Sequence, residues 1–225
     1  MITNRKMKSF ITKKKKSPDF YSEIKLSQIT KPITVLLGPN GCGKSMSIHL
    51  MKEEIGNDLD SLFKAKTKNN GKSFISYSTS GNDILEAHSG PFGDFSPEAL
   101  ICAFRSEGER MTSSFFDWCG TKLVKALHSR DRKALYVFID EADSGLSFDR
   151  IKQHMNQLIE LARWEKEQGR ETYLIFTCNS YEMYECLQSE ITENIWVPTK
   201  ETVEFNNYDE FRRPYWEFYM DYYED

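Results

Sequence analysis

The sequence predicts an α/β domain built on a largely parallel β-sheet, and three observations support that prediction. Two continuous apolar runs, 134–139 and 172–177, have the composition of strands that are buried on both faces. A third apolar run, 33–37, leads into a glycine-rich loop and then into a helical stretch. Strands that alternate with helices are typical of a mostly parallel sheet flanked by helices.

The remaining elements follow from apolar spacing and turn residues. In chain order we expect a helix over 44–54, a strand over 74–77, a helix around 115–127, a helix over 151–162 that Gly169 ends, and a last strand over 194–197. Residues 78–97 are rich in glycine and proline, so we expect most of them to form a loop.

Size and composition fit one globular domain. The chain has 225 residues, of which 39% are hydrophobic and 28% are charged, and this balance excludes a membrane protein and a disordered chain. The start of the chain lacks the apolar core of a secretory signal. The five cysteines are widely spaced and contain no C-x-x-C pair, so neither a zinc site nor a disulfide framework is indicated. We therefore expect a cytoplasmic protein with reduced thiols.

Charge divides the chain into three regions: a basic N-terminal arm (1–31), a central domain (32–200) and an acidic, aromatic C-terminal tail (201–225). The arm, which includes four successive lysines from Lys13, is either a solvated segment or a surface for nucleic acid or an acidic partner. The nine aromatic residues of the tail either pack on the body of the same chain or form a surface for a protein partner.

A phosphate-binding loop is the clearest motif. Residues 38–45 match the pattern G-x-x-x-x-G-K-[ST] in full, with a predicted strand before them and a helix after them. Glycines let the backbone N–H groups point at phosphate oxygens, and the helix N-terminus adds partial positive charge. Lys44 would reach the β- and γ-phosphates of ATP, and the Ser45 hydroxyl would bind Mg²⁺. The expected nucleotide-binding residues are Gly38, Pro39, Asn40, Gly41, Cys42, Gly43, Lys44 and Ser45. A chance match in a glycine turn is the alternative.

Two carboxylates follow the apolar run 134–139. In a parallel sheet they would lie at the carboxyl edge, beside the phosphate loop. Asp140 would hold Mg²⁺ through water, and Glu141 would polarise the attacking water. The alternative is an ordinary acidic turn or helix cap.

These residues resemble the ATP-binding cassette (ABC) superfamily, particularly its non-transporter, SMC- and RecF-like branches. The sequence of the phosphate loop is close to that of the family. Residues 105–110 are similar to its signature sequence, and residues 140–147 are similar to the segment that joins the acidic strand to the D-loop. The resemblance covers roughly residues 33–180. It implies a P-loop NTPase fold with an ABC-type ATPase domain over 32–200.

In the cassette family two chains meet head to tail, and each signature closes over the partner's ATP. The resemblance therefore implies that Ser106, Gly108 and Glu109 bind ATP across a homodimer interface. The alternative for this segment is a charged loop before a helix. Asn179 would occupy the position of the family's catalytic switch histidine. Tyr21 or Phe20 would stack on adenine, unless they simply pack in the core.

The sequence also departs from the cassette pattern. Glu107 replaces the first glycine of the signature, Ser147 replaces the D-loop aspartate, and Asn179 cannot carry a proton as histidine does. No glutamine lies between Lys52 and Glu141, so the Q-loop residue is missing. Its possible substitutes are Ser78, Thr79 and Asn82. These differences leave nucleotide binding intact and argue against fast turnover.

The first functional hypothesis is a stand-alone ABC-type ATPase that binds and hydrolyses Mg-ATP in a head-to-tail dimer and acts in a nucleic-acid-related, defence or repair process. The alternative is a nucleotide-gated binding module with little turnover, which uses ATP-driven dimerisation to engage a partner. A small-molecule or nucleotide kinase is a third reading, but it explains neither 105–110 nor 140–147.

Overall fold

The sheet is six-stranded, and its order is β2-β3-β4-β1-β5-β6. The computed structural model describes residues 24–56, 71–78, 107–128, 133–141, 143 and 146–223. The strands are β1 (Ile33–Leu37), β2 (Lys72–Ser78), β3 (Ala134–Asp140), β4 (Glu171–Cys178), β5 (Thr192–Trp196) and β6 (Glu201–Thr202). All pairs are parallel except β5 with β6. The expected mostly parallel sheet is therefore confirmed, with the two-residue β6 as an addition.

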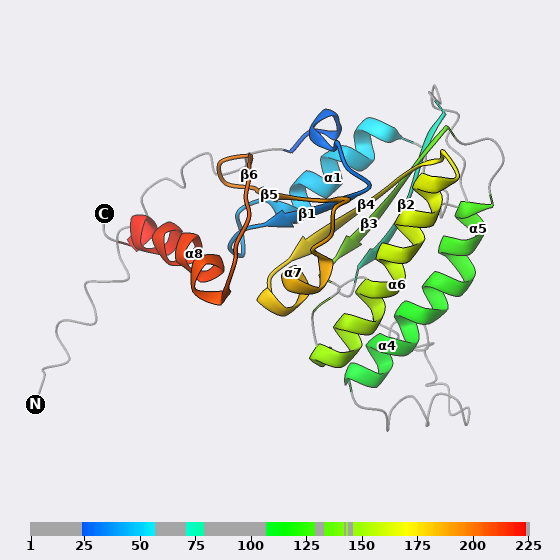
Figure 1. The fold of residues 1–225 in the computed structure, drawn as a ribbon. Coiled ribbons are helices and arrows are strands. Elements are labelled where there is room, and N and C mark those ends of the chain that lie inside the picture. Colours follow the sequence, from blue (N-terminus) through cyan, green and yellow to red (C-terminus); the bar gives the residue numbers. More distant parts are fainter. Residues whose placement is uncertain are drawn as a thin grey trace, which may run out of the picture.

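Helices cover both faces of the sheet (Figure 1). They are η2 (Leu26–Gln28), α1 (Lys44–Ile55), α4 (Glu107–Trp118), the π-helical turn η3 (Cys119–Leu123), α5 (Val124–Leu127), α6 (Phe148–Glu167), α7 (Tyr181–Leu187) and α8 (Tyr208–Tyr223). Gly169 follows α6 with a φ of 67°, as expected of a residue that ends a helix. The loop expected over 78–97 lies outside the described residues, except for Ser78.

Alternation along β1 divides the core into two layers. Val35 lies in one apolar cluster with Met155 of α6, and Leu36 lies in the other with Met51 of α1. All four side chains are almost completely buried, and each such burial stabilises the fold by about 1.5–3 kcal/mol. Because helices cover both faces of the sheet, the sequence of β1 is almost continuously apolar and does not alternate between apolar and polar residues.

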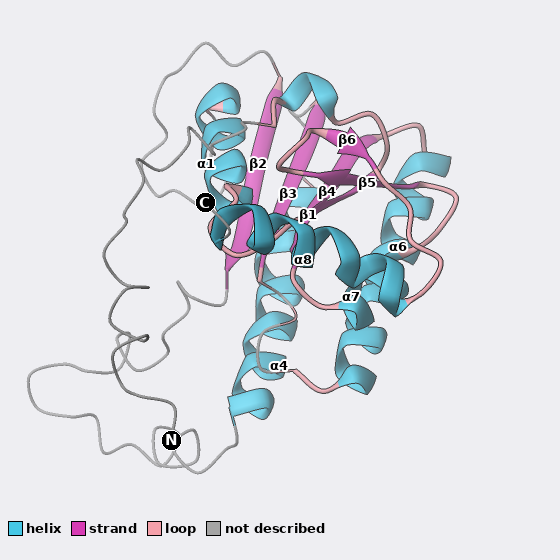
Figure 2. Cartoon of the chain, turned by 90° about the vertical axis from the view of Figure 1, so that its left-hand side faces the viewer, coloured by secondary structure: helices cyan, strands magenta, loops and turns pink. Residues whose placement is uncertain are grey.

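The aromatic tail folds back onto the body of the protein as helix α8. Phe211 is 2% exposed and Tyr215 packs on Trp196 of β5, with ring centroids 4.9 Å apart. Figures 1 and 2 both place α8 beside the ends of the central strands, at the edge where β1 enters the phosphate loop. The helix nevertheless leaves Trp216 and Tyr219 exposed.

None of the described helices combines the length and the apolarity needed to cross a bilayer.

Candidate active site

The loop between β1 and α1 has the conformation that its glycines predict. Gly38, Gly41 and Gly43 have φ values of 146°, 82° and 103°, which glycine adopts without strain. A Cβ atom at Gly38 would lie 2.6 Å from the Cys42 sulfur and 3.1 Å from Pro198 Cδ. The loop can therefore curl over the end of β1 only with glycine at position 38.

Lys44 lies at the centre of this loop. Its ammonium donates hydrogen bonds to the carbonyl oxygens of Gly38, at 2.5 Å, and Pro39, at 3.1 Å. Burial lowers the pKa of Lys44, and nearby Cys42 and Asp140 partly oppose that shift. Among the described residues, the hydrogen-bond partners of this buried ammonium are neutral carbonyls. It is a strong site for an anion, because a phosphate would replace a dipole by an opposite charge.

Ser45 and Asp140 face one another across the site. The Ser45 hydroxyl donates a hydrogen bond to Asp140 Oδ1 at 3.3 Å. Two hard oxygen atoms at this separation fit neighbouring ligands of Mg²⁺, which are about 3 Å apart in its octahedral shell. The described residues contain no cluster of three or more His, Cys, Asp or Glu side chains that could hold a metal ion. Mg²⁺ usually takes one or two carboxylates and completes its shell with phosphates and water.

Glu141 and Asn179 border the same pocket as the phosphate loop. The pocket has a volume of about 300 Å³ and is lined by Asn40, Gly41, Gly43, Lys44, Ser45, Met46, Glu141, Thr177 and Asn179. It forms because β4 lies between β1 and β3, so that all three strands end at one edge. Asp143 holds the turn after β4, since its Oδ2 accepts hydrogen bonds from the N–H groups of Asn179 (3.2 Å) and Ser180 (2.9 Å).

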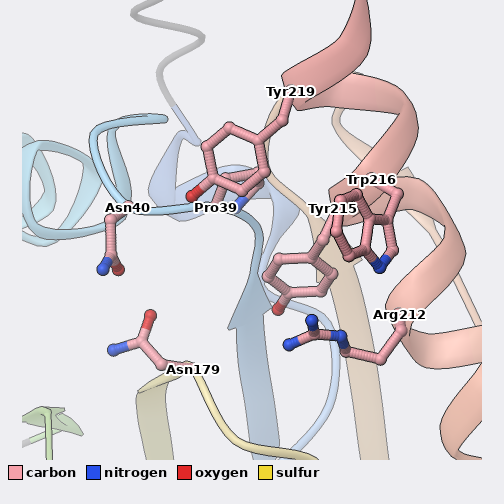
Figure 3. A pocket seen from close by; sticks show the side chains of 7 residues that line it. All are labelled: Pro39, Asn40, Asn179, Arg212, Tyr215, Trp216 and Tyr219. Atoms are coloured by element: carbon pink, nitrogen blue, oxygen red, sulfur yellow. The ribbon is translucent and has the colours of Figure 1, made fainter. Parts of the chain in front are cut away.

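A second pocket, of about 310 Å³, continues from the first toward α8. Asn40 and Asn179 line both pockets, and Pro39, Arg212, Tyr215, Trp216 and Tyr219 complete the second one (Figure 3). In Figure 3 the Arg212 guanidinium extends from α8 toward the Tyr215 hydroxyl and the side of the pocket where Asn179 lies.

Tyr215 ties α8 to the phosphate loop. Its hydroxyl oxygen accepts a hydrogen bond from the Gly38 N–H at 3.4 Å, and burial raises the pKa of the phenol. Arg212 lies over the rings of Tyr208 and Trp216, at 5.7 and 5.9 Å from their centroids. Within the described part of the chain no carboxylate forms an ion pair with Arg212.

The structure brings together the phosphate loop, Asp140, Glu141 and Asn179, all of which the sequence pointed to. Gly108 and Glu109 lie in the first turn of α4, where side chains are not described. Ser106, Phe20, Tyr21, Thr79 and Asn82 lie outside the described residues. Ser78 lies at the end of β2, opposite Asp140 in the strand register.

Sequence reasoning missed the contributions of Thr177, Asp143, Arg212 and Tyr215. The only available signals were the position of Thr177 at the end of a strand and the aromatic density of the tail.

Comparison with known proteins identifies the family. The protein-family model described as "ATPase family associated with various cellular activities (AAA)" matches residues 34–198. No curated protein matches the chain.

The family match overturns the assignment to the ABC superfamily. The phosphate loop and the acidic end of β3 occur in both kinds of ATPase, so they could not distinguish them. The interpretation of 105–110 as a cassette signature was therefore wrong. The role in a signature that the resemblance implied for Ser106, Gly108 and Glu109 loses its basis with it. The absence of a Q-loop glutamine and of a switch histidine is therefore no defect. A match that spans 165 of the 225 residues, on a chain with this sheet and this phosphate loop, shows that the protein belongs to the AAA family of ATPases.

Proposed function

We propose that the phosphates of ATP occupy the 300 Å³ pocket. Membership of the AAA family implies that the chain binds and hydrolyses ATP. The observation that carries this proposal is the convergence of Lys44, Ser45, Glu141 and Asn179, from three different strand ends, on that one space. The same convergence argues against a nucleotide-gated module with little turnover, because both an acidic residue, Glu141, and a cation, Lys44, border the pocket.

Each polar group of the pocket has a distinct role in this proposal. Lys44 exchanges its carbonyl partners for the β- and γ-phosphates. Ser45 and Asp140 would hold Mg²⁺, which when bound would neutralise charge on the phosphates. Glu141 accepts a hydrogen bond from the attacking water and polarises it. The Asn179 amide, held by the Asp143 carboxylate through the backbone of the turn, donates to the γ-phosphate or to that water.

The pocket at α8 suits the base and ribose of the same nucleotide. It shares Asn40 with the phosphate pocket, so one extended ligand can occupy both. Aromatic rings stack on a base of any identity, and Trp216 and Tyr219 are the exposed rings available there. We therefore assign the stacking on adenine to Trp216 or Tyr219 of α8, in place of Tyr21 or Phe20.

Proteins of the AAA family often oligomerise. We propose that this chain associates with itself when ATP is bound, without the head-to-tail cassette geometry. The remaining support for a role in a nucleic-acid-related process is the basic N-terminal arm, because the cassette resemblance that also supported this role was wrong.

Two variants test the site. Glu141→Gln keeps the size of the side chain but weakens it as a base, so it should bind Mg-ATP and lose nearly all turnover. Lys44→Ala should weaken ATP binding about 10- to 150-fold, as expected for a charged hydrogen bond worth about 1.5–3 kcal/mol. Lys52→Ala, two turns further along α1, is the matched control. ATP titration calorimetry and phosphate release measure both quantities, and unchanged hydrolysis in either variant would refute the assignment.

A further inference from the structure

Thr177, at the end of β4, contacts both acidic residues of the active site. Its hydroxyl donates a hydrogen bond to Asp140 Oδ1 at 2.6 Å and accepts one from the Glu141 N–H at 2.9 Å. Thr177 is completely buried and borders the phosphate pocket. A hydroxyl can donate and accept at the same time, so this one group fixes a carboxylate on one residue and the backbone of the next.

The backbone at Glu141 needs such support. Its φ is 55°, in the left-handed region that residues other than glycine seldom adopt. The last pair between β3 and β4 joins Ile139 to Phe176, so the strand ladder with β4 ends before Asp140. Beyond that pair, Thr177 replaces the ladder with a side-chain contact.

We propose that Thr177 is a positioning residue for ATP hydrolysis. By donating to Asp140 it selects the rotamer in which Oδ1 also faces Ser45. By accepting from Glu141 it holds the turn that aims the Glu141 side chain at the phosphate pocket. This inference rests on the roles proposed above for Asp140 and Glu141.

The test compares two buried threonines of the same strand. Thr177→Val removes the hydroxyl and keeps the branched shape. Thr172→Val is the matched control, because the Thr172 hydroxyl also donates to a buried carboxylate, Glu165 Oε2, at 2.8 Å. Thr172 lies at the opposite end of β4, remote from the site.

Thr177→Val should lower kcat about 10- to 100-fold, or raise the Mg²⁺ concentration needed for half-maximal activity by a similar factor, as is usual when a partner of a metal ligand is lost. KM for ATP should change less than about threefold, since phosphate contacts remain. Thr177→Ser should restore most of kcat. Thermal unfolding with ATP alone and with Mg-ATP gives a readout independent of turnover: the extra stabilisation by Mg²⁺ should shrink in Thr177→Val and persist in Thr172→Val.

A merely structural role predicts a different result, in which both valine variants lose thermal stability and activity in parallel and the added effect of Mg²⁺ is unchanged. That result, or a Thr177→Val enzyme with both a normal kcat and a normal Mg²⁺ requirement, overturns the inference. Glu141→Gln, assayed alongside, separates the two proposals. If it keeps full turnover, the roles assigned to the site fail; if it loses turnover while Thr177→Val does not, only the positioning role fails.

Discussion

Single carboxylate oxygens organise this active site. Asp140 Oδ1 accepts hydrogen bonds from Ser45, on the helix after β1, and from Thr177, on β4. Asp143 Oδ2 in turn accepts from two successive N–H groups of the turn after β4. Charged acceptors form the stronger hydrogen bonds. Asp140 at the end of β3 and Asp143 just after it therefore fix the neighbouring strand ends relative to each other.

His154 of α6 is a buried polar residue outside the site. Its ring stacks on Phe115 of α4, with centroids 4.6 Å apart, and contacts Phe116 edge-on. Among the residues that the structure describes, neither ring nitrogen has a hydrogen-bond partner. Burial, with a smaller contribution from Arg150, lowers the pKa of His154 to about 4.

This histidine should make the fold sensitive to acid. The folded chain binds the His154 proton more weakly than the unfolded chain, so acidification from about pH 6.5 toward pH 4 favours unfolding. His154→Leu should reduce the loss of stability over that range, whereas the same change at the exposed His128 should not. Urea unfolding at pH 7, 6 and 5 measures the free energy of unfolding. An equally steep loss in His154→Leu would show that other groups cause it.

At the residue scale, the sequence predicted the site residues that belong to a contiguous motif or directly follow a strand. Lys44, Ser45, Asp140 and Glu141 are of this kind, because the edge of a parallel sheet follows from strand order alone. Asn179 was singled out only through the cassette resemblance. Thr177 could not be assigned in the same way. Its function depends on a contact with a residue 36 positions away, and a threonine in an apolar strand is ordinary in composition.

At the element scale, the ends of strands β1 to β5 were predicted to within two residues, whereas neither β6 nor the helix of the tail was predicted. Dense aromatic residues indicated burial, yet α8 buries Phe211 and exposes Trp216, at 59%. Only the position of the phosphate loop beside α8 explains this division, because one side of the helix packs on β5 while part of the other borders the second pocket.

The second pocket makes a prediction about α8. If Trp216 stacks on the base of ATP, Trp216→Ala should lose about 1–3 kcal/mol of binding, or roughly 5- to 150-fold in affinity. Affinity for inorganic tripolyphosphate, which has no base, should stay the same. Trp164→Ala is the matched control: Trp164 is 47% exposed and also lies under an arginine, with Arg170 at 4.9 Å from its ring. It lies near the end of α6 that precedes β4, away from the phosphate loop.

Competition titrations with a fluorescent nucleotide measure both ligands. Equal losses for ATP and tripolyphosphate in Trp216→Ala would mean that α8 acts on the phosphates or on the loop instead. No loss for either ligand would exclude α8 from the nucleotide site.

At the scale of the whole molecule, the sequence predicted the fold but assigned the wrong family. The features that were read most securely, a phosphate loop after β1 and carboxylates after β3, follow from the chemistry of phosphate binding and are shared among P-loop ATPases. The cassette assignment depended further on two short motifs, 105–110 and 140–147, whose similarity to that family was local. A match over 34–198 outweighs these local similarities, because it extends from β1 through β5.

Family membership leads to a prediction about assembly. Met46, which lines the nucleotide pocket, is 44% exposed, and α8 exposes Met220 and also Trp216, which lines the second pocket. Apolar side chains exposed around a site are typical of a surface that another chain covers.

Since ATP stabilises whichever state binds it more tightly, the associated form should accumulate only while ATP persists. In Glu141→Gln, which should not hydrolyse ATP, sedimentation velocity with Mg-ATP should therefore show a larger species that Mg-ADP does not produce. Lys44→Ala should remain a monomer under both conditions, because its nucleotide affinity is reduced. If Glu141→Gln saturated with Mg-ATP sediments as a monomer at every concentration tested, then this AAA domain turns over ATP without self-association, and the exposed residues around the pocket must serve a different partner.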